Sequence, residues 1–498
     1  MDEILPYIYY SLPWAFMILL SVAAVAAIGV GLVWPRLLVY PYLAVYFCIN
    51  STSYGSLLVF SSSTIYSRGS GLLLFGLLLW YVLGAWACAR VAAAFQRTPA
   101  PECNLRPWFW GWFVLLAAHA AVGMVYGATL RQSLSPQGFS NIVWMAPLIS
   151  LILLSFRTRE QVQELCQFIL LVGLGRALFG LGRWATFGGD PNNIYANMNA
   201  IKIRLTYFDI NDSLVCTLAF AIAAVHLFQT QKGERPAFWR GIEWMTLVST
   251  ALCIVLSYRR SAWIGFVLAF LVIMMRFPVR RRIQLMAAGM PLVGAALVYA
   301  GMQRMAQTKG AASGLASLVY DMQSRRFGPE SERVLELKLA LADILAQPLT
   351  GIGSWGRYNG YQYISWQNNP DGGLFLHSGV LHIALKSGLA GTALLSGTII
   401  AFAIFARRAL KTLPPELLGI GTAGVAGIAF MIPDLLIGTP FPQVRTTQML
   451  AVCLALPYLA MAVSKTAPGV HPARQPVVPV PLPGSQPGPQ PGSQPIPA

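Results

Sequence analysis

Residues 252–275 read LCIVLSYRRSAWIGFVLAFLVIMM, two apolar runs separated by a short polar turn that carries Arg259 and Arg260. Such runs, extended by their apolar neighbours, can cross the hydrocarbon core of a bilayer, which takes about 20 residues of helix. The runs are continuous and do not alternate as the strands of a membrane barrel do. This stretch therefore predicts α-helical membrane spans with two arginines held at the membrane surface.

The composition extends this prediction to the whole chain. Of its 498 residues, 56% are hydrophobic and 11% are charged, whereas soluble domains carry roughly 25% charged residues. The predicted fold class is an all-α polytopic bundle of about 12–13 transmembrane spans. The expected spans lie near residues 12–32, 37–59, 70–92, 107–127, 140–155, 164–182, 210–229, 240–257, 261–276, 283–302, 378–405, 416–436 and 446–464.

The basic residues predict the orientation of the bundle. Clusters of arginine and lysine lie in five connecting segments that thirteen spans place on one face, and cytoplasmic loops are those that collect such residues. The clusters begin at Arg90, Arg157, Lys232, Arg276 and Arg407. The C-terminus is then cytoplasmic and the acidic N-terminus external. Topology thus explains much of the net charge of +17, and no nucleic-acid partner is expected.

Two segments depart from the pattern of spans and turns. Residues 303–377 form an external loop far longer than a usual connection, which suggests a functional role. Within it, Ser331 caps a predicted amphipathic helix that ends before Pro348 and rests on the bundle or the membrane surface. Residues 466–498 are rich in Pro, Gly, Ser and Gln and predict a disordered cytoplasmic tail. Residues 1–465 then form one transmembrane domain that contains the loop.

Arginines on the external face are the first candidates for chemistry. Guanidinium groups bind phosphate through paired hydrogen bonds. Arg259 and Arg260 lie hard against apolar spans, and Arg204 enters another span on the same face. The alternatives are an ordinary loop charge for the pair and a salt bridge to Asp209 for Arg204. We predict that these arginines bind a phosphorylated, membrane-bound substrate.

His377 is the candidate base. It follows the long loop and opens a span, where an imidazole can accept a proton from a sugar hydroxyl near neutral pH. A packed interfacial histidine is the alternative, and His382 points roughly 140° away around the helix. Trp355 and Tyr358, after the loop helix, suit sugar binding or a membrane-interface belt. No metal site is predicted, because the external carboxylates are scattered.

Four segments, in order along the chain, resemble motifs of the bacterial O-antigen ligase and polymerase superfamily. The turn Ser257-Tyr258-Arg259-Arg260-Ser261 with its flanks is similar to the Ser-Arg-Gly type motif of that superfamily. The other three are the segment from Arg204 to Asn211, the loop helix from Arg333 with the turn Pro348-Leu349-Thr350-Gly351-Ile352-Gly353, and the segment from His377 to Gly391. The resemblance covers roughly residues 200–410.

The resemblance implies an inverting, metal-independent glycosyltransferase that uses a polyprenyl-diphosphate-linked glycan as donor and needs no cofactor. By position, Arg204 and Arg260 match two essential arginines of the family, and His377 matches the proposed base. Two departures stand out. Tyr207 replaces a usual glycine, and Lys386 replaces a frequent glutamate.

The resemblance also implies a location and an acceptor. The protein would be a multi-pass protein of the bacterial inner membrane, in contact with membrane lipid, with its active site facing the periplasm. The acceptor would be a sugar hydroxyl, either of another lipid-linked glycan, as in a polymerase, or of lipid A–core or a protein, as in a ligase. The Tyr-Arg-Arg variant of the arginine motif favours an exopolysaccharide or O-antigen polymerase. A polysaccharide flippase or other transporter is the alternative class, and a scaffold acting through the proline-rich tail is a third.

Overall fold

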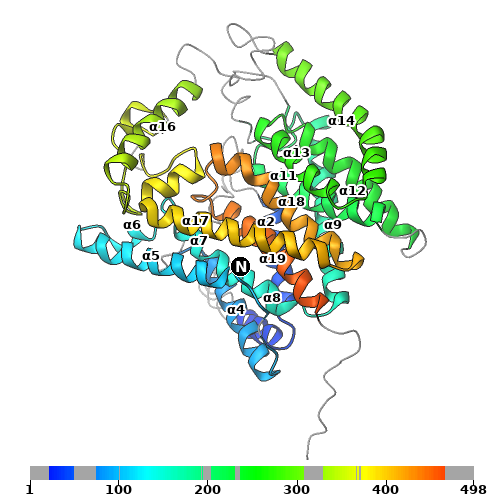
Figure 1. Cartoon of the computed structure of the whole chain (residues 1–498), viewed down its shortest axis with the longest axis horizontal. Coiled ribbons are helices and arrows are strands. Elements are labelled where there is room, and N and C mark those ends of the chain that lie inside the picture. The colour runs from blue at the N-terminus through cyan, green and yellow to red at the C-terminus, as the bar shows by residue number, and fades with distance from the viewer. Residues whose placement is uncertain are drawn as a thin grey trace, which may run out of the picture.

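A computed structural model describes residues 22–49, 75–99, 101–191, 193, 204–229, 236–307, 329–365, 367–368 and 372–465. Throughout these residues, the regular secondary structure is helical (Figure 1). The α-helices are α2 (Arg36–Cys48), α4 (Leu77–Phe95), α5 (Arg106–Val125), α6 (Leu130–Ser133), α7 (Ser140–Val143), α8 (Met145–Ser155), α9 (Arg159–Thr186), α11 (Ile210–Gln229), α12 (Ala237–Val255), α13 (Arg260–Met274), α14 (Val279–Gln307), α16 (Pro329–Ala346), α17 (Gly379–Thr412), α18 (Pro415–Ile437) and α19 (Val444–Ser464), with a 3₁₀ helix, η2, at Tyr361–Tyr363. The predicted fold class, an all-α polytopic bundle, is confirmed.

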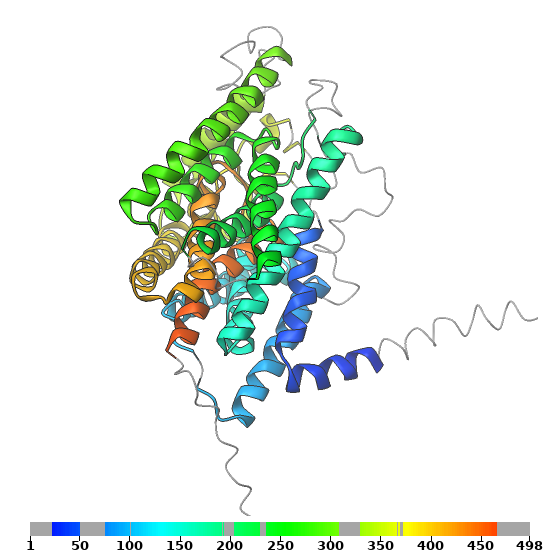
Figure 2. The same ribbon diagram turned by 90° about the vertical axis from the view of Figure 1, so that its right-hand side faces the viewer.

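Eight of the described helices are long and apolar enough to cross a membrane, and all eight coincide with predicted spans. They are α4, α5, α9, α11, α12, α17, α18 and α19. The helix Val22–Val33 and α2 would add a ninth span if taken together, but they meet at a bend of 116°. Figure 2 shows the first of these two helices leading away from the bundle. The count of 12–13 stays a prediction because residues 1–21 and 50–74 lie outside the described residues, as does the tail at 466–498.

Two further predicted spans are shorter apolar helices in the structure. Residues 140–155 form α7 and α8, and the span predicted at 261–276 is α13, of 15 residues. A helix of that length measures about 22 Å, whereas the hydrocarbon core of a bilayer is about 30 Å thick. By length alone, α13 is therefore shorter than the hydrocarbon core.

The centre of the bundle is formed by α11, α18 and α19, which are buried along most of their length. Both α11 and α19 pack against α18, and so does α13 (Figure 1). Small residues permit this close approach. Gly427 of α18 lies against Cys453 of α19, and Gly173 of α9 lies against Ala219 of α11.

The termini of several helices meet at one end of the bundle, which we call the site end. α12 ends there at Val255 and α18 at Ile437, while α13 begins there at Arg260 and α17 at Gly379. α11 and α19 also begin there, joined by the contact of Asp209 with the second residue of α19. The segments that carry Arg204, Arg260 and His377 therefore reach the same end.

The loop docks on α17 at a kink. Gly388 interrupts this helix with a φ of 56° and a ψ of −146°. A side chain there would meet the carbonyl oxygen of Leu349 at 2.5 Å and that of Pro348 at 2.7 Å. The backbone N–H of Leu389 donates to Pro348 O at 2.8 Å. Two of the motifs that resemble the superfamily, the proline–glycine turn and the start of α17, are thus in direct contact.

The loop helix is present as α16, which ends before Pro348 as the sequence predicts. Its polar side faces the protein, so most of its apolar side does not pack on the bundle, which was one of the two surfaces expected for it. Glu336, Ala340 and Asp343 are buried, while most of the predicted apolar stripe is exposed. The exposed members of the stripe are Val334, Leu335, Leu341 and Leu345. A buried carboxylate needs hydrogen-bond donors, and the loop supplies them, so polar contacts hold the helix and leave its apolar face outward.

Replacing Gly388 with Ala should weaken the docking of the loop on α17. The added methyl group would meet backbone atoms, and this combination of φ and ψ, nearly restricted to glycine, costs another residue about 1–3 kcal/mol. We expect a lower thermal midpoint for the purified protein in detergent. Gly182→Ala is the matched control, because Gly182 lies inside α9 with nothing within 4 Å of the added atom. A midpoint that Gly388→Ala leaves unchanged would contradict this account of the kink.

Candidate functional site

The segment that carries Arg204 lies against the turn between α12 and α13. The backbone N–H of Thr206 donates to Leu256 O at 3.1 Å. The hydroxyl group of Thr206 donates to Cys253 O at 2.7 Å. Arg204 itself is exposed. Two segments that the sequence selects for their arginines are therefore adjacent in space.

The turn between α12 and α13 gives its two arginines different positions. Tyr258 has a φ of 52°, so the chain reverses before Arg259. The Arg259 guanidinium donates a hydrogen bond to the carbonyl of Phe208 and lies 5.4 Å from the centroid of its ring. Arg260 is the first residue of α13, whose first turn contains no acidic residue. A cation at the positive end of a helix is unfavourable, and a bound anion would relieve the repulsion.

Four charged side chains form a buried network beside these segments, the ion tetrad of Arg176, Asp209, Asp212 and Arg445. Arg445 lies 2.8 Å from Asp209 and 2.8 Å from Asp212. Arg176 lies 2.6 Å from Asp212. Two positive and two negative charges balance one another, which makes their removal from water tolerable. Asp209, considered above as a partner for Arg204, is thus part of a network that joins α9, α11 and α19.

Tyr207, which stands where related proteins usually have glycine, is buried between two arginines. The guanidinium carbon of Arg176 lies 4.5 Å from its ring centroid, and that of Arg183 lies at 4.9 Å. Its hydroxyl donates to Arg176 O at 2.6 Å. Arg183 also pairs with Asp190 at 3.1 Å. Cation–π contacts of this kind contribute about 0.5–2 kcal/mol, so the tyrosine anchors the Arg204 segment to α9.

His377 lies just before α17 and is held by Glu336 of α16. The Nδ1 atom of His377 is 3.0 Å from Glu336 Oε2, and the His377 backbone N–H donates to that oxygen at 3.2 Å. Gln367 Nε2 donates to the other oxygen, Oε1, at 3.0 Å. The side chain of Glu336 is 0% exposed and that of His377 is 23% exposed. The loop and the membrane helix therefore meet at a carboxylate–imidazole pair.

Asp434, in the last turn of α18, lies between the two halves of the site. The charges that act on its buried carboxylate include those of Arg259, Arg333 and His377 and the negative charge of Asp209. Arg333 precedes Glu336 by one turn of α16, and among the described residues its buried Nε has no hydrogen-bond partner. This convergence, the Asp434 cluster, contains two guanidinium groups of the kind that bind an anionic phosphate.

The two aromatic residues predicted to bind sugar are packed within the protein. The ring centroid of Trp355 lies 6.1 Å from that of His119, and the indole also lies against Gly123 of α5. Tyr358 is 0% exposed. Burial raises the pKa of the Tyr358 phenol, and the negative charge of Glu336 acts in the same direction. Both side chains stabilise the loop, and stacking of Tyr358 on a sugar would require the loop to open.

Two polar residues of α17 connect this helix to neighbouring segments. His382 is buried, and its Nε2 atom lies 2.9 Å from Gly138 O. Lys386, which replaces a glutamate frequent in related proteins, is buried and donates to Gly356 O at 2.6 Å. A carbonyl partner requires a donor, so lysine suits this position where glutamate would not.

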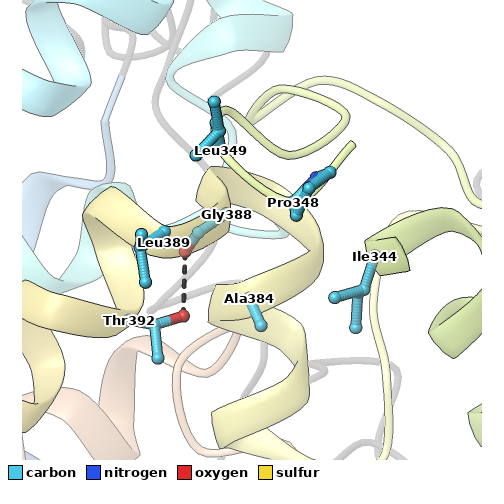
Figure 3. Close-up of a pocket in the computed structure, with 7 residues that line it drawn as sticks. All are labelled: Ile344, Pro348, Leu349, Ala384, Gly388, Leu389 and Thr392. Atoms are coloured by element: carbon cyan, nitrogen blue, oxygen red, sulfur yellow. Dashed lines mark hydrogen bonds between the residues drawn. The ribbon is translucent and has the colours of Figure 1, made fainter. Parts of the chain in front are cut away.

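An apolar cavity of about 240 Å³ lies where the loop docks on the kink of α17 (Figure 3). Its walls are formed by Ile344, Pro348, Leu349, Ala384, Gly388, Leu389 and Thr392. The hydroxyl of Thr392 is occupied, since it donates to Gly388 O at 2.8 Å. Because these side chains carry no charge, the cavity suits hydrocarbon and lacks the groups that would bind a diphosphate.

Arg333, Glu336 and Asp434 were not predicted as site residues. The sequence does contain a signal for each of them. Arg333, Glu336 and Asp343 repeat at helical spacing between apolar residues, and a polar stripe of this kind can be the buried side of a membrane-surface helix. Asp434 is an acidic residue inside an apolar span, a position that is energetically costly and commonly functional.

The described segments contain no group of three or more His, Cys, Asp or Glu side chains that could hold a metal ion.

Replacing Arg445 with Leu should strongly destabilise the protein. The substitution leaves Asp209 and Asp212 buried with one fewer cation, and breaking a buried pair costs about 3–5 kcal/mol. Arg36→Leu is the matched control, because Arg36 makes an equally short contact of 2.8 Å with Glu164 at an exposed site. Exposed pairs contribute only about 0–1 kcal/mol. Equal losses of thermal stability in the two variants would show that the ion tetrad has no special role.

Comparison with known proteins supports the resemblance. Residues 245–396 match the model of a protein family described as O-antigen ligase. The matched region runs from α12 to α17 and contains Arg259, Arg260, Arg333, Glu336 and His377. A search of curated proteins finds no match to the chain. The predicted resemblance to the O-antigen ligase and polymerase superfamily is confirmed for this region, residues 245–396.

Proposed function

We propose that this protein is an inverting glycosyltransferase of the bacterial inner membrane, which transfers a glycan from a polyprenyl-diphosphate donor to a sugar hydroxyl at the periplasmic face. The observation that carries the proposal is the Asp434 cluster, in which Arg259, Arg333 and His377 converge on the end of α18. A diphosphate needs cations and an attacking hydroxyl needs a base. The cluster brings both kinds of group to the end of the bundle where Arg260 begins α13.

In this proposal the arginines bind the diphosphate of the donor. Arg204 and Arg260 are the arginines assigned by resemblance, and Arg259 and Arg333 join them from the contacts at the site end. The diphosphate gains charge as its bond to the sugar breaks, so guanidinium groups held in place stabilise the transition state more than the bound donor. The start of α13 adds the positive end of a helix.

The proposed step is a single displacement at the anomeric carbon of the donor sugar. The acceptor oxygen attacks from the side opposite the diphosphate, and a new C–O bond forms. The bond between the anomeric carbon and the phosphate oxygen breaks, and its electron pair leaves with the diphosphate. The hydroxyl proton passes to His377, acting as general base. Attack from the opposite side inverts the anomeric configuration.

Lipid access is supported by apolar surfaces beside the site. The outward stripe of α16 is exposed, with Leu345 at 70%, and Leu389 of α17 is exposed next to the apolar cavity. Surfaces of this kind are stable only in contact with hydrocarbon. The lipid chain of the donor would therefore stay in the bilayer while the diphosphate reaches the arginines.

A transporter is less well supported than an enzyme. Secondary transporters bind their substrates near the middle of the membrane at interrupted helices. Here the ion tetrad and the Asp434 cluster lie where α11, α13, α17 and α19 begin and α18 ends.

The sequence of the arginine turn favours another lipid-linked glycan as the acceptor, and lipid A–core or a protein is the alternative.

Single substitutions of Arg260, Arg333 and His377 by Ala should each reduce turnover by about 10²-fold or more, because each removes charge stabilisation or the base. The assay uses purified protein in nanodiscs with a synthetic polyprenyl-diphosphate glycan, with or without lipid A–core. Product analysis gives the acceptor and the anomeric configuration.

Arg407→Ala is the control for loss of a positive charge, because Arg407 is exposed near the other end of α17. It should keep activity close to that of the unmodified protein. Full activity of His377→Ala would refute the assigned base, and full activity of both Arg260→Ala and Arg333→Ala would refute the diphosphate site. A product that retains the donor configuration would exclude the single displacement.

A further inference from the structure

We infer that Glu336 is a positioning residue, which fixes the tautomer and the orientation of His377 so that its Nε2 atom receives the proton. The inference deepens the proposed function and rests on it, because it assigns a partner to the proposed base. It depends on the hydrogen bonds that surround one carboxylate, which lies on the loop helix α16.

In the part of the chain that the structure describes, two fixed donors and the Nδ1 atom of His377 contact the carboxylate of Glu336. The His377 backbone N–H, which can act only as a donor, contacts Oε2 at 3.2 Å. The Gln367 side-chain amide contacts Oε1 at 3.0 Å. His377 Nδ1 lies 3.0 Å from Oε2 and 3.3 Å from Oε1. An ionised carboxylate accepts all of these bonds, whereas a protonated one would lose part of its accepting capacity.

The orientation of the Gln367 amide is set by the backbone around it. Its Oε1 atom accepts from the Gly373 N–H at 2.9 Å. Its Nε2 atom donates to Phe375 O at 3.0 Å. Turning the amide over would place oxygen against a carbonyl and NH₂ against an N–H. The nitrogen must therefore face Glu336, where it acts as a donor.

The hydrogen bonds around Glu336 in turn determine which nitrogen of the His377 imidazole carries the proton. With two donors already fixed and the carboxylate ionised, Nδ1 of His377 faces an acceptor and carries a proton. In a neutral imidazole with Nδ1 protonated, the lone pair lies on Nε2. The contact at Nδ1 also fixes the plane of the ring, because the backbone N–H of the same residue binds the same carboxylate. Nε2 is thus the nitrogen prepared to accept the hydroxyl proton.

Asp343 provides an internal comparison on the same face of α16. Its carboxylate is also buried. It accepts from the Asn359 backbone N–H at 2.6 Å and from the Asn359 side chain at 2.7 Å. Two buried carboxylates, seven positions apart on one helix, thus have different partners. Asp343 holds the fold of the loop, and Glu336 holds the base.

The test compares Glu336→Gln with Asp343→Asn, each in the full-length protein in nanodiscs. Glu336→Gln replaces one accepting oxygen with a donor that faces other donors. We expect kcat to fall about 10²-fold or more, as expected for a base in the wrong tautomer, with the donor KM changed less than about threefold. Glu336→Asp, which keeps the charge on a shorter side chain, should recover part of kcat. Asp343→Asn should lower the thermal midpoint while keeping kcat within about threefold.

A second readout does not depend on turnover. The protein is labelled with ¹⁵N in its histidine rings, and His377→Ala identifies the resonances of His377. At about pH 8.5, the unmodified protein should show the Nδ1–H tautomer at this residue. Glu336→Gln should shift the population toward the Nε2–H tautomer.

The outcomes separate this inference from the proposed function. If His377→Ala is inactive but Glu336→Gln keeps its kcat or its tautomer, the positioning role is wrong and the proposed function stands. If His377→Ala is fully active, His377 is not the base and both fail. If Glu336→Gln and Asp343→Asn lose kcat and thermal midpoint equally, Glu336 has a structural role only. If the Glu336 variant does not fold, the tautomer in the unmodified protein still decides, because Nε2–H there would refute the assignment.

Discussion

The structure depends on the burial of four charges where α11 begins. In the ion tetrad, Arg445 is 0% exposed and contacts both Asp209 and Asp212. An unpaired charge in this position would cost several kcal/mol, so α9, α11 and α19 can assemble only with these groups in register. Arg445 also donates to the carbonyl of Tyr46 at the end of α2. This constraint fixes Asp209, which lies within the segment from Arg204 to Asn211, and therefore the place of that segment beside Arg259.

Residues of the candidate site lie both inside and outside the region that matches the family model. Residues 245–396 contain the arginine turn, the loop helix and His377. Arg204 precedes this region, and Asp434, around which the cations gather, follows it. The matched region thus supplies most of the chemical groups, while helices outside it set the distances between them. The tyrosine at position 207 fits this division, because it secures the Arg204 segment through arginines of α9, outside the matched region.

Hydropathy predicts the helices well and the contacts between them poorly. A long apolar run such as 210–229 has one stable form in a bilayer, and the structure has a helix there with the same bounds. The partners of charged side chains are harder to predict, because a buried charge depends on a partner that no local sequence pattern reveals. His377 was selected for its place after the loop, but its partner Glu336 lies 41 positions earlier. The apolar stripe of α16 was recognised, but the choice between the bundle and the membrane surface stayed open, because burial of Glu336 and Asp343 decides it.

The outward direction of the apolar stripe of α16 follows from what the loop must do. A helix packed through apolar side chains could rotate or slide on the bundle at modest cost, since such contacts are non-directional. Hydrogen bonds to buried carboxylates are directional, and losing one leaves an unsatisfied buried group. Glu336 and Asp343 therefore fix the rotation and the register of α16, and Glu336 does so through His377 itself. The hydrogen bonds that order the loop are therefore also those that contact the imidazole, and the apolar side of α16 is left facing outward.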